Sequence, residues 1–256
     1  MNKITSPVLL FAALVILAGC SGKGSSGKGL AADADTVSVP DTGYTGIKQY
    51  FSNELMLKEV TFSNGVRDGL MKTYYPGGQL YQTFWYENGF REDSAVWYYL
   101  EGQTFRTTPY KTDTVDGIQK QYYRTGKLKA MIGFSKGLRT PFLEEYDPNG
   151  RVIRTYPEIV TEIIDEYGSK GYYRIGLSMS DKTTKVKFYR GDFTDGRFDT
   201  ALIRELDVVN GKTSLILRKS DSAKPAYVGV IAEIVTQFGN RHLIYRKIEL
   251  PYSDLN

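Results

Sequence analysis

The hydrophobic positions in the middle of the chain recur with a period of 24 residues. One column of this pattern is aromatic, and columns of tyrosine, of glycine and of a second turn residue keep the same spacing. Because these columns share one period, we interpret 62–85, 86–109, 110–133 and 134–157 as repeats and 44–61 as a partial fifth. The columns are Phe62, Tyr86, Tyr110 and Phe134; Tyr74, Tyr98, Tyr122 and Tyr146; Gly78, Gly102, Gly126 and Gly150; and Gly65, Gly89, Asp113 and Gly137.

Each repeat has the pattern of a β-hairpin. In the first, aromatic and β-branched runs at 70–75 and 79–86 flank Pro76-Gly77-Gly78, and Asn88-Gly89 follows the second run. Pro and Gly favour turns, and Asn-Gly favours a two-residue hairpin because both residues accept a positive φ. One hairpin is marginal in water, whereas stacked hairpins share an apolar face. The sequence therefore predicts an elongated antiparallel sheet of stacked hairpins over 44–157.

The last hundred residues lack this period. Every second residue from 173 to 179 is apolar, which predicts a half-buried strand. Apolar runs flank Asn210-Gly211 (202–209 and 213–218) and Gly239-Asn240 (226–238 and 242–250), and we interpret both pairs of runs as hairpins. We therefore predict an all-β protein, with a small β-sandwich-like domain over 158–256 that has its own core.

One segment of this second domain fits two structures. The apolar residues at 159, 160, 163, 164 and 167 fit a helical stripe, which Pro157 could begin and Gly168 could end. The same positions are β-branched or aromatic, which favours a strand. Both alternatives stay open at this point.

The amino-terminal residues resemble the signal of a bacterial lipoprotein. The run 7–18 has no charged side chain and is shorter than the roughly 20 residues that a membrane-spanning helix needs. It fits the apolar part of a secretory signal. It ends in Leu17-Ala18-Gly19-Cys20, which resembles a lipobox. The resemblance implies a signal peptide over 1–19, cleavage between Gly19 and Cys20, and lipid attachment at Cys20.

A flexible tether is predicted over 20–43, since 21–29 contains only Gly, Ser and Lys. The tether also matches seven positions of a P-loop. However, Gly29 stands where Ser or Thr must reach the magnesium ion, and no strand precedes the segment. We therefore expect no nucleotide site there.

Composition excludes several classes of function. The chain has 33 Lys and Arg against 29 Asp and Glu, a net charge of +4, and no clustered basic stretch, so we expect no nucleic-acid partner. With one Cys and one His, we expect no disulfide, no metal site, no cofactor and no catalytic residue. The only histidine, His242, reads as an exposed residue at the start of a strand.

Two acidic features have a functional alternative. The group Asp192, Asp195 and Asp199 could bind calcium, but its spacing does not fit an EF-hand loop, so we interpret it as a polar turn. The pairs Glu144-Glu145 and Asp165-Glu166 could serve a hydrolase. Neighbours on a strand point to opposite faces, so we interpret both pairs as solvated edges.

The first repeat resembles the MORN repeat in its bacterial variant form. The resemblance rests on Asn64-Gly65-x-x-Asp68-Gly69-x-x-Lys72-x-Tyr74-Tyr75-x-x-Gly78-x-Leu80. It covers 44–157 and weakens later, where Asp93 and Pro141 replace the second glycine of the motif. It implies a binding or scaffolding role, and many bacterial proteins of this kind are catalogued as antitoxin components.

These observations favour a non-enzymatic lipoprotein that binds a protein or another partner in the cell envelope. It would be anchored to a bacterial membrane, the outer one in a Gram-negative cell, and face the periplasm or the surface. Two alternatives are an antitoxin-like or immunity-like protein that neutralises a toxin, and a carboxylate-dependent hydrolase. The candidate partner-binding stripe is Tyr74, Tyr98, Tyr122 and Tyr146, for which we favour cross-strand packing as the main role.

Overall fold

The computed structural model describes residues 43–220 and 226–256. This part of the chain consists almost entirely of antiparallel strands and includes one four-residue helix, α1 (Tyr167–Lys170). The all-β prediction is confirmed. None of the described helices is long and apolar enough to cross a membrane. The predicted signal peptide, the predicted lipid attachment at Cys20 and residues 20–42 of the predicted tether lie outside the described residues.

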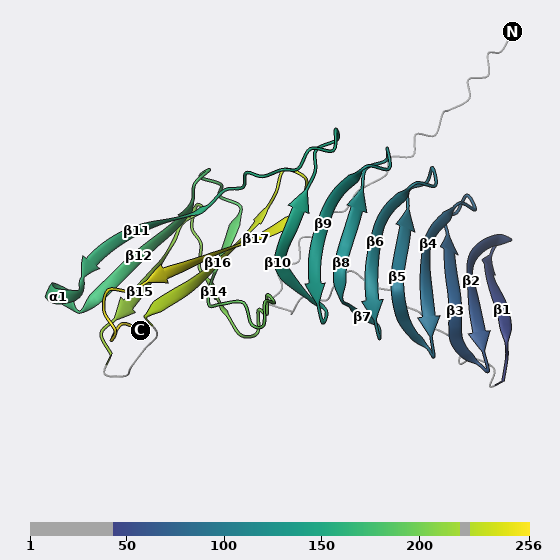
Figure 1. Cartoon of the computed structure of the whole chain (residues 1–256), viewed down its shortest axis with the longest axis horizontal. Coiled ribbons are helices and arrows are strands. Elements are labelled where there is room, and N and C mark those ends of the chain that lie inside the picture. Colours follow the sequence, from purple (N-terminus) through teal and green to yellow (C-terminus); the bar gives the residue numbers. More distant parts are fainter. Residues whose placement is uncertain (1–42, 221–225) are drawn as a thin grey trace, which may run out of the picture. The chain divides into compact units, whose positions relative to one another are not determined.

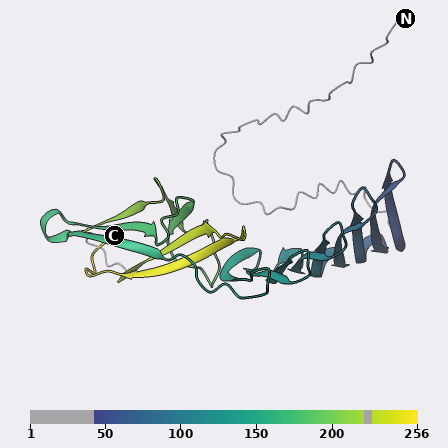
Figure 2. The same cartoon turned by 90° about the horizontal axis from the view of Figure 1, so that it is seen from above.

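The repeats form one large antiparallel sheet, as predicted (Figure 1). Its strands pair in chain order, except that the short β7 pairs with β6 beside β8. Seen from above, these strands form a single layer (Figure 2). The strands are β1 (Gly46–Ser52), β2 (Leu55–Ser63), β3 (Val66–Tyr74), β4 (Leu80–Glu87), β5 (Phe90–Tyr98), β6 (Thr104–Lys111), β7 (Thr114–Val115), β8 (Gly117–Tyr122), β9 (Leu128–Ser135) and β10 (Leu138–Glu145).

The turn columns of the sequence explain why the chain reverses where it does. Asn88 and Gly89 have φ angles of 49° and 88°, as a two-residue hairpin turn with a right-handed strand twist requires. At the other edge, Gly78 has a φ of 82° and its N–H donates to the Tyr75 carbonyl oxygen at 2.8 Å. The same bond recurs one period later, from Gly102 to Tyr99. The 24-residue period is therefore the length of one hairpin and its two turns.

The two faces of this sheet differ in burial. In β4, Gln82, Phe84 and Tyr86 are buried whereas Tyr81 and Trp85 are exposed. We call the face that contains Phe84 the core face and the opposite face the outer face. Aromatic rings and aliphatic side chains pack against one another on the core face. Its buried cluster is Val60, Phe62, Met71, Phe84, Tyr86, Ala95 and Trp97.

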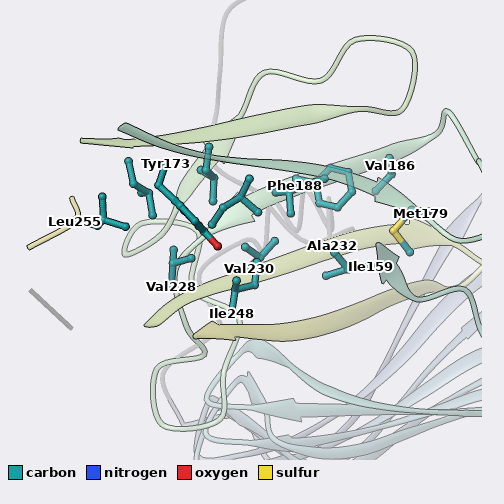
Figure 3. Packing of buried hydrophobic residues seen from close by; sticks show 14 of the residues in the cluster. Ile159, Tyr173, Met179, Val186, Phe188, Val228, Val230, Ala232, Ile248 and Leu255 are labelled. Atoms are coloured by element: carbon teal, nitrogen blue, oxygen red, sulfur yellow. The ribbon is translucent and has the colours of Figure 1, made fainter. Parts of the chain in front are cut away.

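The remaining strands form two smaller sheets that enclose a second core. One has the order β11 (Ile159–Glu166), β12 (Tyr172–Met179), β15 (Thr213–Arg218). The other has the order β14 (Arg204–Leu206), β13 (Val186–Arg190), β16 (Tyr227–Val235), β17 (Arg241–Glu249). Side chains from both sheets, such as Tyr173, Phe188 and Val230, share one buried cluster (Figure 3). Its members all come from residues 159–255.

The structure decides between the two alternatives for the segment after Pro157, and it corrects one hairpin. Residues 159–166 form the strand β11, and the helix α1 begins only at residue 167. The hairpin around Gly239-Asn240 is confirmed as β16–β17. The prediction that 202–209 and 213–218 pair as a hairpin around Asn210-Gly211 is wrong, because β14 pairs with β13 while β15 pairs with β12. That turn is tight, but it leads the chain from one small sheet into the other.

Candidate functional site

The outer face of the large sheet exposes large apolar side chains from successive hairpins. Trp85 on β4 is 42% exposed and Leu70, its partner on β3, is 38% exposed. Each alternates with a core-face neighbour, so both point away from the buried cluster. Contiguous exposed apolar surface of this kind commonly marks an interaction site. Further exposed apolar residues on this face are Ile118 and Phe142.

Charged side chains of both signs lie among these apolar residues. Glu59 on β2 opposes Lys72 on β3 and forms an ion pair with it at 3.5 Å. At the far end of the sheet, Lys120 opposes Met131, which opposes Glu144. The face is therefore mixed in charge, in contrast to the uniformly basic surface that nucleic acids require.

The predicted tyrosine stripe is half-buried and lies outside the buried cluster of the core face. The hydroxyl of Tyr74 donates to Glu59 at 2.6 Å, and that of Tyr146 donates to Glu144. Burial and the bond to Glu59 raise the pKa of Tyr74 to about 12. Tyr98 and Tyr122 are also half-buried. Their role in partner binding stays a prediction.

A second tyrosine column, which the sequence analysis did not single out, connects successive repeats. The hydroxyl of Tyr75 donates to the carbonyl oxygen of Tyr98 at 2.8 Å. Tyr99 donates to Tyr122 at 2.8 Å and Tyr123 donates to Tyr146 at 2.7 Å, one and two periods later. We call Tyr75, Tyr99 and Tyr123 the tyrosine ladder. The 24-residue period could have revealed this column, which ends in the last repeat, where Asp147 stands in place of a tyrosine.

The ladder also fixes exposed aromatic rings at the turn edge of the sheet. Tyr75 packs edge-to-face against Tyr81, with ring centroids 4.9 Å apart. One period later, Tyr99 packs in the same way against Phe105 at 5.2 Å. Edge-to-face pairs are a favourable aromatic geometry. Exposed Tyr81 and Phe105 are thus held in equivalent positions on adjacent repeats.

A buried carboxylate joins the last repeat to the β16–β17 hairpin. Glu145, at the end of β10, is fully buried. Its carboxylate accepts hydrogen bonds from Thr236 at 2.7 Å, from the Asn240 side-chain amide at 2.6 Å and from the Tyr156 hydroxyl at 3.2 Å. The prediction of a solvated edge is therefore wrong for Glu145. Its charge is buried because donors from a segment 95 residues away compensate it.

His242 lies beside this carboxylate and is half-buried, so its predicted exposure is wrong. Its ring centroid lies 4.4 Å from that of Tyr156. The pKa of His242 is lowered, chiefly because the ring is buried. The negative charge of Glu145 opposes this shift, and the positive charge of Arg139 adds to it. Although a carboxylate, an imidazole and a phenol meet here, the carboxylate oxygens are taken by structural donors. We therefore interpret Glu145, Tyr156, Thr236, Asn240 and His242 as a polar joint, and use that name below.

The aspartate group lies in the loop after β13, and each of its members has a partner within the protein. Asp192 accepts from the Tyr245 hydroxyl at 2.5 Å, Asp195 pairs with Arg197 at 2.8 Å, and Asp199 accepts from the Ala201 N–H at 3.0 Å. Within residues 43–220 and 226–256, no three acidic, His or Cys side chains are arranged to hold a metal ion.

Comparison with known proteins agrees with the repeat pattern. Residues 67–88 and 115–136 match the family model of the MORN repeat variant. The two matches begin 115 − 67 = 48 residues apart, which is two periods. The resemblance of the repeats is thus confirmed, and repeats of this kind are generally binding or scaffold modules. No curated protein matches the chain.

Proposed function

We propose that the protein is a non-enzymatic binding module and that the outer face of the β1–β10 sheet is its recognition surface. The observation that carries this proposal is the exposure of Trp85, Leu70 and their apolar neighbours on that face. Large rigid side chains of this type dominate the energetics of protein interfaces. The tyrosine ladder supports the proposal because its hydrogen bonds connect successive repeats and stiffen the sheet, so little entropy is lost on binding.

The chemistry of the face favours a protein partner. Ion-paired Glu59 and Lys72 lie next to apolar surface, which is the composition of an apolar interface centre with a polar rim. In the polar joint, by contrast, the carboxylate of Glu145 is fully buried and already accepts three hydrogen bonds. That arrangement supports a structural role for the joint rather than hydrolysis.

In this proposal the module is a lipoprotein of the bacterial envelope. The sequence Leu17-Ala18-Gly19-Cys20 supports cleavage before Cys20 and lipid attachment there. The tether up to residue 43 would then hold the repeats near the membrane without fixing their orientation. The partner would be another protein of the same compartment.

Site-specific photo-cross-linking in the native cell tests the recognition surface. A photoreactive residue is placed at Trp85 or Leu70. The control position is Leu202, an apolar residue that is 63% exposed and far from the repeats in sequence. We expect a cross-linked partner from the two outer-face positions and none from Leu202. Cross-links from Leu202 alone would contradict the proposal. The identity of the partner separates an envelope protein from a toxin, which would favour the antitoxin alternative.

A loss-of-binding variant completes the test. Trp85→Ala removes the largest exposed ring of the face, and hot-spot truncations of this kind cost about 2 kcal/mol or more of binding free energy. Because Trp85 lies outside the buried cluster, the melting temperature should hardly change. If Trp85→Ala and Leu70→Ala both capture the partner as well as the unchanged chain does, the outer face does not bind it.

A further inference from the structure

The strand β1 forms an open edge of the large sheet. It pairs with β2 on one side, and among the described residues no strand pairs with its other side. The other end of the sheet is covered, since β10 contacts β17 and carries Pro141. An exposed edge without proline and with little charge is a ready template for a further strand. In β1, the only charged residue is Lys48.

The sequence of β1, Gly-Ile-Lys-Gln-Tyr-Phe-Ser, is complementary to its own reverse. If a second β1 lies antiparallel to the first with Gln49 opposite Gln49, then Ile47 lies opposite Phe51 and Lys48 lies opposite Tyr50. By two-fold symmetry each of these two contacts forms twice. In this register the apolar side chains of Ile47 and Phe51 are in contact, the ammonium of Lys48 lies against the ring of Tyr50, and no two like charges are directly opposite each other.

The positions of these side chains in the structure fit that arrangement. Ile47 is 62% exposed and Phe51 is 54% exposed, whereas Tyr50 packs against the core-face cluster. Residues at alternate positions of a strand share a face, so Ile47, Gln49 and Phe51 lie together on the outer face. Tyr50 already accepts a cation at its ring, since the Lys58 ammonium lies 4.8 Å from the ring centroid and that of Lys48 lies 5.9 Å away. A second copy would add Lys48 to this site.

We propose that two copies of this chain pair through β1, antiparallel and centred on Gln49. The pairing joins the two large sheets into one. The two-fold axis is perpendicular to the sheet, so the two outer faces become one continuous surface. The exposed Ile47 and Phe51 of each copy are then covered by those of the other. A second copy is the occupant rather than an unrelated extended peptide, because the complementarity lies within β1 itself.

Disulfide trapping tests the register. In the full chain, Gln49→Cys places two cysteines directly opposite each other, at the short distance between opposed Cα atoms of antiparallel strands. Lys48→Cys is the matched control, since it faces Tyr50 and lies too far from its own symmetry mate for a disulfide. The unchanged chain, with Cys20 alone, measures dimers that form through that residue.

Under mild oxidation we expect a reducible dimer at least tenfold more abundant for Gln49→Cys than for Lys48→Cys or the unchanged chain. Equal amounts for the two cysteine variants, or no dimer above that of the unchanged chain, would overturn the proposed register.

A charge exchange tests the pairing without a cross-link. Ile47→Lys or Phe51→Glu alone places a charge opposite an apolar side chain, and we expect sedimentation to change from the mass of a dimer to that of a monomer. The double variant places Lys opposite Glu in both contacts and should restore the dimer. Ile118→Lys and Phe90→Glu, at exposed positions on β8 and β5, are the matched controls and should remain dimeric. A monomeric unchanged chain, or a double variant that stays monomeric, would refute the proposal.

Discussion

The buried carboxylate of Glu145 gives the sharpest prediction about stability. Glu145→Ala removes the acceptor for Thr236, Asn240 and Tyr156 and leaves these donors in a buried site. Hydrogen bonds to a charged group contribute about 1.5–3 kcal/mol each, but such contributions are not additive. Breaking a buried charged site by removing one partner costs about 3–5 kcal/mol, which we take as the expected loss in free energy of unfolding.

The location of these donors determines how the loss of stability appears in an unfolding experiment. Glu145 belongs to β10, whereas Thr236 and Asn240 belong to the β16–β17 hairpin, so the carboxylate links two regions with separate buried clusters. In urea, monitored by tryptophan fluorescence and by circular dichroism, we expect Glu145→Ala to unfold in two steps. Both Trp lie in the repeats, at 85 and 97, so fluorescence reports that region alone.

Two variants serve as controls for this experiment. Glu144→Ala removes the neighbouring carboxylate, which points to the outer face and accepts a bond from Tyr146, and should cost about 1 kcal/mol or less. Glu145→Gln keeps the shape and one acceptor oxygen, and should lose less than Glu145→Ala. If Glu145→Ala destabilises no more than Glu144→Ala, the polar joint does not hold the two regions together and the reasoning is refuted.

Four further predictions concern other parts of the molecule. Tyr99→Phe removes one hydrogen bond of the tyrosine ladder and should lower the free energy of unfolding by about 1 kcal/mol. The control Tyr98→Phe should change it by a few tenths of a kcal/mol at most. Equal losses in denaturant titrations would show that the ladder bond does not stabilise the sheet. Burial lowers the pKa of His242, so on acidification this histidine is protonated in the unfolded chain at a higher pH than in the folded one, and stability should fall as the pH drops below about 6.5. The variant His242→Gln should flatten this fall. An unchanged pH profile of stability would show that another group causes it. A fragment of residues 157–256 should fold alone with a cooperative melt, because its buried cluster draws only on 159–255; a fragment without dispersed amide signals would show a shared core. Mass spectrometry of the membrane-extracted protein should find a first peptide that begins at Cys20 and carries acyl groups; an unmodified peptide that begins elsewhere would exclude lipidation.

The repeat architecture could be predicted from the sequence because its causes are local. A turn needs residues that accept a positive φ, such as Asn88 and Gly89, and a half-buried strand needs alternation. Both patterns are written in consecutive residues, and their recurrence after 24 residues makes each hairpin pair with the next. The strand β12 is an equally local case, since its alternating residues are alternately buried in the structure.

What only the tertiary structure decided depends on contacts between distant segments. Residues 159–166 fit a helix and a strand equally well in isolation, and pairing along β12 selects the strand. The turn at Asn210-Gly211 reverses the chain, but pairing of β15 with β12 places that strand in the other small sheet. Glu145 is buried because Asn240 reaches it from 95 residues away. No pattern in neighbouring residues signals such a partner, since the energy of burying a charge depends on which donors the complete fold brings to it.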